Sequence, residues 1–484
     1  MKSAEVIVFI LYLLCMLGIG IFFFIKDRKG GEKTFFLGDR KMGAWVGALS
    51  AGASDMSAWV LMGLPTSVYA FGLGKIWIPV GLVAGYTASW LLEAPRLRRF
   101  SIVSGDAITI PQYLSNRFLA KSKALQVICA VVFLLAYTVY AASSIKACGT
   151  LFHKVIGMDP MTAMYLAVFI IVGYTFMGGF SAVCWTDFFQ GMLILGAMLF
   201  APVFALFVLE FSGEAIDPAS HFWNPAADWR DVVSGLAWGL GYFGMPHIII
   251  RFMSISSQKT LKRSAWIGIA WTLLILIFAA LIGIIGRLDF GMDADMAKNE
   301  LVFVQMVRRI FPGVISGILL SAVLAASMST ADSQLLSASS SLASDVYKPI
   351  VRKNRASDRE LMWVGRFVVL AVAVIALVIA AIPNSGSIMG LVENAWGLFG
   401  AAFGPAILLS LFWRKFNFAG AVTGIVVGAG VDICWIIFLK DTGVYEILPG
   451  FAAGAVAAFA AAKIAGAPSE AVLKQYDAAV AYDD

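Results

Sequence analysis

The chain has 484 residues, of which 60% are hydrophobic and only 14% are charged, and its formal net charge is +6. A soluble protein carries about 25% charged residues, so the composition excludes a soluble globular protein and predicts one that crosses a membrane many times. The positive charge fits basic loops beside a membrane and requires no nucleic acid as a partner.

Apolar runs of helical length recur from residue 5 almost to residue 466 and predict about thirteen transmembrane helices. No small-residue cleavage site follows the first run, so we interpret it as a retained helix rather than a signal peptide. We expect the helices near residues 5–25, 43–71, 73–94, 124–151, 160–178, 186–210, 231–251, 264–286, 313–343, 361–382, 388–413, 418–439 and 446–466. The short stretch 301–311 contains two arginines and predicts an amphipathic helix at the outer surface.

The basic loops fall on alternate sides of this count, which places them together on one face of the membrane. Examples are "KDRKGGEK" and "YKPIVRKNRASDR", whereas the opposite loops "EFSGEAIDPASHFWNPAADWRD" and "RLDFGMDADMAKNE" are acidic or mixed. Because basic loops stay in the cytoplasm, we expect the amino terminus outside and the carboxyl terminus in the cytoplasm.

Two of the predicted helices carry helix-breaking residues at membrane depth: "SAGASDMSAWVLMGLP" and "GLAWGLGYFGMPHIIIRF". Glycine loosens a helix, and proline removes a backbone donor. Unwound backbone is tolerated at this depth only beside protein or a water-filled cavity. The residues concerned are Gly52, Gly63, Pro65, Gly239, Gly241, Gly244 and Pro246. An alternative is that the glycines only permit close helix packing.

With the first helix set apart, the two interrupted helices are the first and sixth of the next ten. This placement is typical of two inverted repeats of five helices. We therefore predict a single membrane transport domain over residues 1–484. Its parts are an extra helix (5–25), two repeats (43–210 and 231–413), two additional helices (418–466) and a cytoplasmic tail (467–484).

Several polar residues also lie within the predicted membrane helices. Ser329, Thr330, Asp332 and Ser333 lie within about one helical turn. Membrane hydroxyls usually bond back to a carbonyl of their own helix, but four hard oxygen donors could also hold a desolvated alkali cation. Asp187 has two interpretations, a functional carboxylate or one that is stabilised by a helix start. No catalytic motif is present, so we do not expect an enzyme.

The motifs "LSAGASDMSAWVLMGLP", "GYTFMGGFSAVCWTDFFQ", "AWGLGYFGMPHIIIRFM", "GILLSAVLAASMST" and "GAAFGP" resemble the sodium:solute symporter family over nearly the whole chain. The combination of "SAGASDMS" with "YFGMPHI" is similar to its proline-transporting branch. The resemblance implies an all-α polytopic fold of the LeuT type, a 5+5 inverted repeat with one extra amino-terminal helix.

The resemblance also implies which residues bind the ion and the substrate. The main sodium site would consist of the carbonyls of Ala53, Met56 and Ala326 and the hydroxyls of Ser329 and Thr330. The substrate site would include Asp55, Ser57, Trp59, Gly63, Tyr140, Trp238, Tyr242 and Pro246. Asp55 could contact the ion, contact the substrate or hold the broken backbone in shape.

Some relatives have a second sodium site, which would correspond here to Asp187, Ser329, Asp332 and Ser333. Asp332 is an acid where those relatives carry a serine or an apolar residue. A second sodium ion and a different role for Asp332 are therefore both open.

The implied function is sodium-coupled import of L-proline by alternating access, with sodium co-transported and membrane lipid around the protein. The implied location is the cytoplasmic (inner) membrane of a bacterium, and we expect the monomer to be functional. One alternative is a sodium symporter for another small amino acid or a carboxylate, and a remote alternative is an ion channel.

Overall fold

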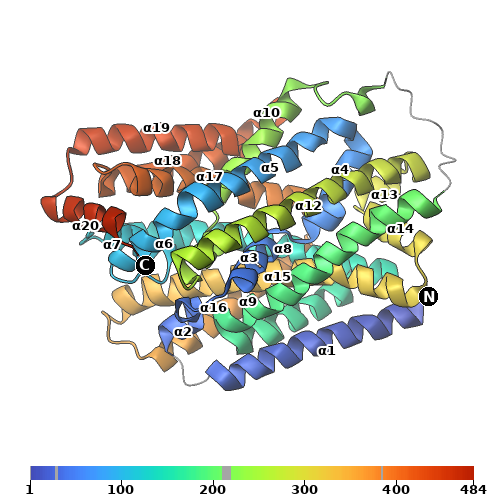
Figure 1. The fold of residues 1–484 in the computed structure, drawn as a ribbon, viewed down its shortest axis with the longest axis horizontal. Helices are drawn as coiled ribbons and strands as arrows, with labels where there is room; N and C mark the ends of the chain where they lie inside the picture. Colours follow the sequence, from blue (N-terminus) through green and yellow to red (C-terminus); the bar gives the residue numbers. More distant parts are fainter. Residues whose placement is uncertain (1, 28–30, 210–219, 383–384, 484) are drawn as a thin grey trace.

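The computed structural model describes residues 2–27, 31–209, 220–382 and 385–483, and these form a bundle of helices (Figure 1). Over these residues the β-structure consists of one isolated bridge, Met42 to Ile255. The helices of the first half are α1 (Lys2–Asp27), α2 (Glu32–Leu37), α3 (Ala44–Asp55), α4 (Leu64–Phe71), α5 (Trp77–Ala88), α6 (Ala94–Val103), α7 (Ile110–Arg117), α8 (Ala124–Ile156) and α9 (Pro160–Val208). Those of the second half are α10 (Trp229–Ala237), α11 (Pro246–Ser254), α12 (Gln258–Phe290), α13 (Ala294–Lys298), α14 (Val302–Ile310), α15 (Gly313–Ser340), α16 (Asp358–Ala381), α17 (Ile388–Phe412), α18 (Phe418–Phe438), α19 (Ile447–Ala465) and α20 (Glu470–Ala481).

Ten helices among the described residues are long and apolar enough to cross a membrane. The number is eleven when the bent pair of Trp229–Phe243 and α11 counts as one span. The predicted thirteen differs from this number for two reasons. Residues 59–103 count as one helix although Gly72 (φ 80°, ψ −160°) interrupts them. The first part of α9, Pro160–Gly173, falls in a class of shorter apolar helices. Starting from eleven, counting residues 59–103 as two helices and adding Pro160–Gly173 gives thirteen.

Polar side chains cap the first turn of several of these helices and so fix where they begin. Asp159 accepts bonds from the backbone N–H groups of the first turn of α9, as Ser387 does for α17 and Asn417 for α18. Such caps satisfy donors that have no partner within the helix. The predicted short helix at 301–311 is present as α14.

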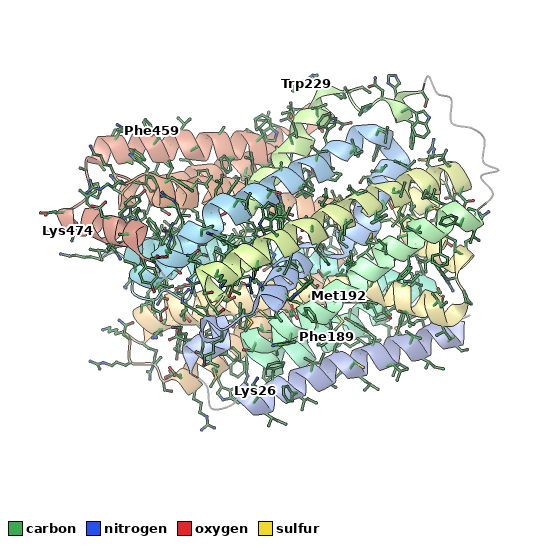
Figure 2. All side chains as sticks on the ribbon, viewed as in Figure 1. Lys26, Phe189, Met192, Trp229, Phe459 and Lys474 are labelled. Atoms are coloured by element: carbon green, nitrogen blue, oxygen red, sulfur yellow. The ribbon has the colours of Figure 1, made fainter. Side chains whose placement is uncertain are left out.

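The outer surface of the bundle is apolar, as a surface in lipid must be. Phe189, Met192 and Phe459 are between 46% and 51% exposed and project from the helices (Figure 2). The helix α1 lies along one edge of the bundle and packs on α9 and α15, while α18 and α19 form the opposite edge (Figure 1).

The glycines of the two interrupted segments serve mainly in packing. A Cβ on Gly52 would meet the ring of Trp271 at 2.6 Å, and one on Gly239 would overlap the carbonyl oxygen of Gly81. The first break is at Met56 (ψ 72°), which is not a glycine. The second is at Gly244 and Met245, directly before Pro246, where the chain bends by 45°. Close packing therefore explains Gly52 and Gly239, whereas the helices are interrupted at Met56 and Gly244.

Close packing where α5 crosses the segment Trp238–Phe243, which follows α10, gives a testable prediction. A Cβ on Gly85 would overlap the carbonyl oxygen of Gly239, a backbone atom that cannot rotate away. We expect Gly85→Ala to lower the free energy of unfolding by about 1–3 kcal/mol, the usual effect of overpacking. Thermal unfolding of the purified protein measures this. The control is Gly430→Ala in α18, which has open space around its Cβ position and should unfold no earlier than the unchanged chain.

Candidate functional site

The interruption after α3 exposes backbone carbonyls in the middle of the bundle. The N–H of Ser57 donates to the carbonyl of Asp55 (2.9 Å) instead of continuing the helix, and that of Val60 donates to the Ser57 carbonyl (3.1 Å). The carbonyl of Ala53 is thereby released from the helical ladder. The unwound turn also brings Met56 into a fully buried position.

The hydroxyls of α15 bond to this released carbonyl. Ser329 Oγ donates to the Ala53 carbonyl at 2.8 Å, and Thr330 Oγ1 lies 3.5 Å from the same oxygen. Ser329 Oγ is also 3.2 Å from the carbonyl of Ala326. Four of the five residues predicted for the main sodium site thus share one group of contacts between α3 and α15. The fifth, Met56, lies beside them in the unwound turn.

Asp55 is fully buried at the end of α3. Its Oδ2 accepts a hydrogen bond from the hydroxyl of Tyr242 at 2.5 Å, and its Oδ1 is buried without a hydrogen-bond partner in the structure. Its backbone carbonyl accepts from Tyr140 Oη (3.2 Å) and from Trp59 Nε1 (3.1 Å). One side chain and one carbonyl of the same residue therefore hold three aromatic residues of the predicted substrate site.

Further aromatic rings continue this group. The ring of Trp238 lies 6.0 Å from that of Trp59 and 6.1 Å from that of Trp396, measured between ring centres. Trp396 Nε1 donates to the carbonyl of Trp238 at 2.8 Å, and its ring lies edge-on to Tyr242 at 5.0 Å. Nothing in the sequence around Trp396 distinguishes it from an ordinary core tryptophan, so sequence reasoning missed it.

The remaining predicted substrate residues are Ser57, Gly63 and Pro246. Ser57 is buried in the unwound turn, and Pro246 starts α11. Gly63 lies farther along, where a Cβ would stand 3.1 Å from Met389. It lines a cavity of about 540 Å³ that Trp238 and Glu300 also line. This cavity adjoins the aromatic group on one side.

The opposite end of the interrupted helices is closed. The N–H of Met42 donates to the carbonyl of Ser254, and the N–H of Ser256 donates to the carbonyl of Met42, both at 3.1 Å. Arg40 reinforces this junction with a bond to the carbonyl of Met253 (2.6 Å). The start of α3 is therefore tied to the end of α11.

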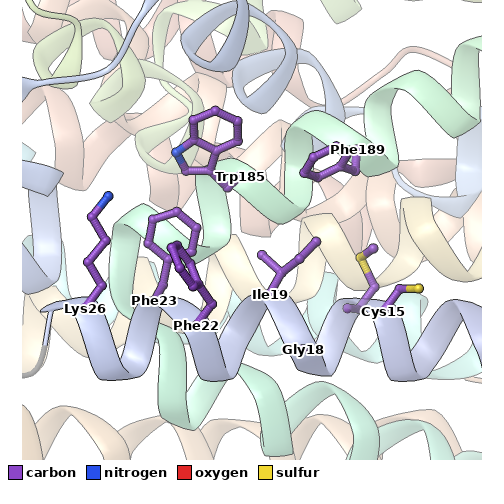
Figure 3. A pocket seen from close by; sticks show the side chains of 9 residues that line it. Cys15, Gly18, Ile19, Phe22, Phe23, Lys26, Trp185 and Phe189 are labelled. Atoms are coloured by element: carbon purple, nitrogen blue, oxygen red, sulfur yellow. The ribbon is translucent and has the colours of Figure 1, made fainter.

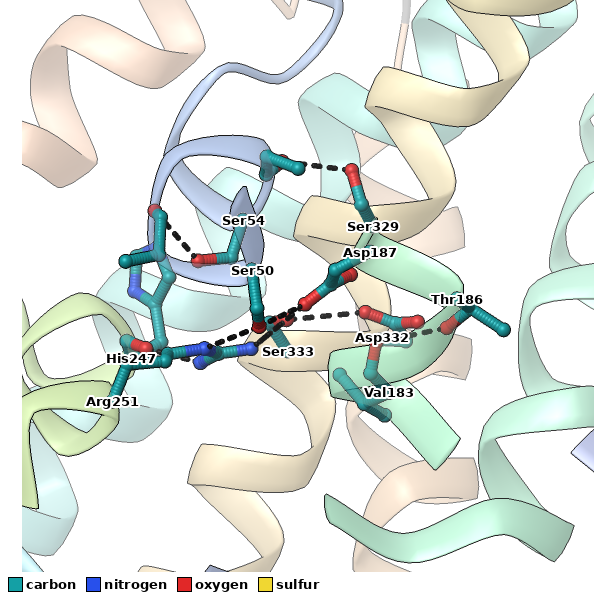
Figure 4. Close-up of polar contacts among 12 residues, drawn as sticks. Ser50, Ser54, Val183, Thr186, Asp187, His247, Arg251, Ser329, Asp332 and Ser333 are labelled. Carbon is teal, nitrogen blue, oxygen red and sulfur yellow. Dashed lines mark hydrogen bonds and ion pairs between the residues drawn. The ribbon is translucent and has the colours of Figure 1, made fainter. Parts of the chain in front are cut away.

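Arg251 connects a second polar cluster (Figure 4). Its guanidinium lies 3.2 Å from Asp187 Oδ2 and 2.5 Å from Ser333 Oγ, and it donates to Ser50 Oγ at 3.1 Å. Ser50 Oγ donates to the same carboxylate at 2.7 Å, and Ser333 Oγ lies 3.2 Å from Asp332 Oδ1. Three residues of the predicted second sodium site, Asp187, Asp332 and Ser333, thus lie in one cluster around an arginine. The fourth, Ser329, bonds to Ala53 and Ala326 instead.

The structure also bears on the two interpretations of Asp187. The helix α9 is interrupted at Gly179 (φ 61°, ψ −173°), and Asp187 lies eight residues beyond, more than two helical turns. Side chains rather than helix-terminal N–H groups are its partners. Arg251 was not among the predicted site residues, although an arginine in the apolar run "HIIIRFM" is itself a signal for a functional or paired charge.

The sequence model of the sodium:solute symporter family matches residues 35–428. The chain is 42% identical to the high-affinity proline transporter PutP of Bacillus subtilis, over 94% of this chain and 97% of that protein. It is 40% identical to a sodium/proline symporter of Staphylococcus aureus, over 94% of this chain and 92% of that protein.

Solved structures are similar in fold. A substrate-bound, Na⁺-coupled sialic acid symporter matches with a TM-score of 0.79 at 20% identity, over 96% of this chain and 99% of that one. The nucleobase-cation-symport-1 family transporter Mhp1 matches with a TM-score of 0.56 at 15% identity, over 92% and 98%. The predicted all-α fold of the LeuT type is thereby confirmed. This chain is a member of the sodium:solute symporter family.

Proposed function

We propose that this chain couples the entry of Na⁺ to the import of L-proline by alternating access. One observation carries the proposal: the unwound turn at Met56 brings the Ala53 carbonyl against the hydroxyls of α15, directly beside the aromatic group around Asp55. An ion site and a substrate site of suitable chemistry then share one backbone turn. The two similar proteins that are named for proline support the choice of substrate.

The proposed ligands of Na⁺ are the carbonyls of Ala53, Met56 and Ala326 with the hydroxyls of Ser329 and Thr330. Na⁺ is a small, hard cation, so uncharged oxygen atoms suit it. Ser329 is within hydrogen-bond distance of two of these carbonyls. A hydroxyl that donates to a carbonyl can turn its lone pairs toward a cation instead. Met56 lies in the same unwound turn, three residues after Ala53, and we propose that its carbonyl completes the set of ligands.

Proline carries a carboxylate and a secondary ammonium on an apolar ring, and the residues around Asp55 match each part. We propose that the unpaired Asp55 Oδ1 accepts from the ammonium, and that Trp59, Tyr140, Trp238 and Tyr242 enclose the ring. Ser57, Gly63 and Pro246 complete the site, with half-helix N-terminal N–H groups available for the carboxylate.

Coupling follows from the position of the ion between two helices. A cation that binds Ala53 in α3 and Ser329 in α15 stabilises the arrangement in which the two helices touch. Differential affinity of this kind shifts the population of conformations. The cavity that Trp238 lines lies on one side of the proposed site, while the Met42–Ser254 junction closes the other. We propose that this arrangement faces the outside of the cell.

The membrane orientation and the parts of the domain remain proposals. The chain is a multi-pass membrane protein whose relatives are transporters. We propose the bacterial cytoplasmic membrane, with the amino terminus outside, and two repeats at residues 43–210 and 231–413. We assign no catalytic activity. A second sodium ion at Asp187, Asp332 and Ser333 stays a prediction, and there Arg251 already provides positive charge.

Removal of a hydroxyl from the proposed sodium site gives a direct prediction. We expect Ser329→Ala, and likewise Thr330→Val, to raise the Na⁺ concentration for half-maximal uptake about tenfold, the effect of one lost polar contact. The matched control is Ser327→Ala, because the Ser327 hydroxyl bonds to the carbonyl of Val323 in its own helix (2.8 Å). If the sodium dependence of uptake is unchanged in both site variants, the ion binds elsewhere and the proposed site is wrong.

Substrate identity is tested by competition. Vesicles that contain the purified protein take up labelled L-proline under a sodium gradient while unlabelled amino acids or carboxylates are added in turn. We expect L-proline and close five-membered-ring analogues to compete at the lowest concentrations. If another small amino acid or a carboxylate competes at a lower concentration than proline does, that solute is the substrate and the proline assignment is wrong.

A further inference from the structure

A groove of about 700 Å³ runs along α1 where this helix meets the second half of α9 (Figure 3). Its walls include Met16, Ile19 and Phe22 of α1 and Phe189 of α9, and they are apolar along their length. Gly18 leaves the groove open, because a Cβ placed there would meet no atom within 4 Å. The proposed transport function uses none of these residues.

The length of the groove matches one leaflet of a membrane. Cys15 and Lys26 are the first and last residues of α1 that line it. Eleven residues of helix rise about 17 Å, whereas half of a hydrocarbon core is about 15 Å thick. The groove is therefore about as long as one leaflet is thick, which is the depth that one acyl chain reaches.

The two ends of the groove differ in charge. Lys26 lies in the last turn of α1, and its Nζ is 5.2 Å from the centre of the Phe23 ring. The Phe23 ring in turn stacks on Trp185, with ring centres 6.3 Å apart. Figure 3 shows these three side chains at one end of the groove and Cys15 and Phe189 toward the other. Lysine and tryptophan are the residues typical of the membrane–water interface.

We propose that this groove binds an anionic phospholipid, with one acyl chain along α1 and its phosphate beside Lys26. The apolar walls match the chain, and the ammonium of Lys26 matches the negative headgroup. A second copy of the chain is the alternative occupant. The proposal is independent of the transported solute, so it can fail without affecting the assignment of proline.

Trp185 is a natural reporter because it is 37% exposed and lines the groove. The emission of Trp185 alone is obtained by subtracting the tryptophan fluorescence of the Trp185→Phe variant from that of the unchanged chain, both measured in vesicles. The probes are phosphatidylglycerol and phosphatidylcholine, each with brominated acyl chains that quench tryptophan on contact. We expect half-maximal quenching at about a fivefold lower mole fraction of the anionic lipid, the effect of one cation near a phosphate.

Lys26→Gln should remove this preference while both lipids still quench. Lys463→Gln is the matched control, because Lys463 also lies in the last turn of its helix and over two rings, 5.8 Å from Trp413 and 5.5 Å from Phe459. It should leave the preference intact. Equal quenching by both lipids in the unchanged chain, or a preference that survives Lys26→Gln, overturns the proposal.

Filling the groove is a second, independent test. Gly18→Leu places a side chain in the open space and should reduce quenching by both lipids at least severalfold. Gly196→Leu in α9, at a position equally free of neighbours, should not. A second copy as the occupant predicts a different result: quenching of the unchanged chain is weak, and it falls further as more protein is added per vesicle. That result would contradict a lipid site.

Discussion

Asp55→Asn is expected to lower sodium-driven proline uptake by about 10- to 100-fold, because a charged hydrogen-bonding group contributes about 1.5–3 kcal/mol. Asparagine has nearly the shape of aspartate but lacks the charge. In the structure Oδ2 already accepts from Tyr242, whereas Oδ1 is buried without a partner and is available to an ion or an ammonium group. Initial rates of uptake into vesicles, measured against both proline and sodium concentration, test this expectation.

The same measurement separates the three roles open to Asp55. A contact with Na⁺ predicts that the half-saturating sodium concentration rises most, and a contact with proline predicts the larger rise for proline. If Asp55 only holds the turn in shape, both constants stay near their original values and the protein unfolds at a lower temperature. Tyr242→Phe is the control, since it removes the 2.5 Å bond but leaves the carboxylate, and we expect a smaller loss.

Arg251→Met should lower the free energy of unfolding by about 3–5 kcal/mol, the effect of leaving a buried carboxylate without its partner. Arg251 and Asp187 are 1% and 0% exposed, so bulk solvent does not reach the carboxylate that is left behind. Thermal or denaturant unfolding of the purified protein measures this effect. The double variant Asp187→Asn with Arg251→Met removes both charges and should recover much of the loss.

A surface ion pair provides the comparison. Arg414 bonds to both oxygens of Asp477, but the two side chains are 48% and 51% exposed. Pairs of this kind contribute about 0–1 kcal/mol, so Arg414→Met should change stability little. If Arg251→Met unfolds like the Arg414 variant, the buried pair is not the structural connection that its geometry indicates.

The fold could be predicted from the sequence to a considerable extent. Apolar run length gives the helices, and Asp55 in an apolar stretch points to the interruption that follows it. The exact break could not be placed, because Gly52 and Gly239 look like helix breakers but pack against Trp271 and Gly81. Which atom a glycine faces depends on a helix far away in the sequence, and one sequence does not contain that pairing.

The site could be predicted only in part, for the same reason. Ser329 and Ala53 are 276 positions apart, and only the resemblance to a family joined them before the structure did. Arg251 could have been found, since a charge in an apolar run is a recognised signal, but its pairing with Asp187 could not. Trp396 packs against Trp238 and Tyr242 of the aromatic group and gives no such signal, because a buried aromatic residue is ordinary in any core.

The central claim is that a sodium gradient drives proline into the cell. The most direct measurement uses purified protein in vesicles, with labelled L-proline outside and an inward gradient of sodium, potassium or protons in separate samples. We predict accumulation above the outside concentration with the sodium gradient alone, and stronger accumulation when the interior is electrically negative. Equal accumulation under a potassium or proton gradient without sodium would contradict sodium coupling.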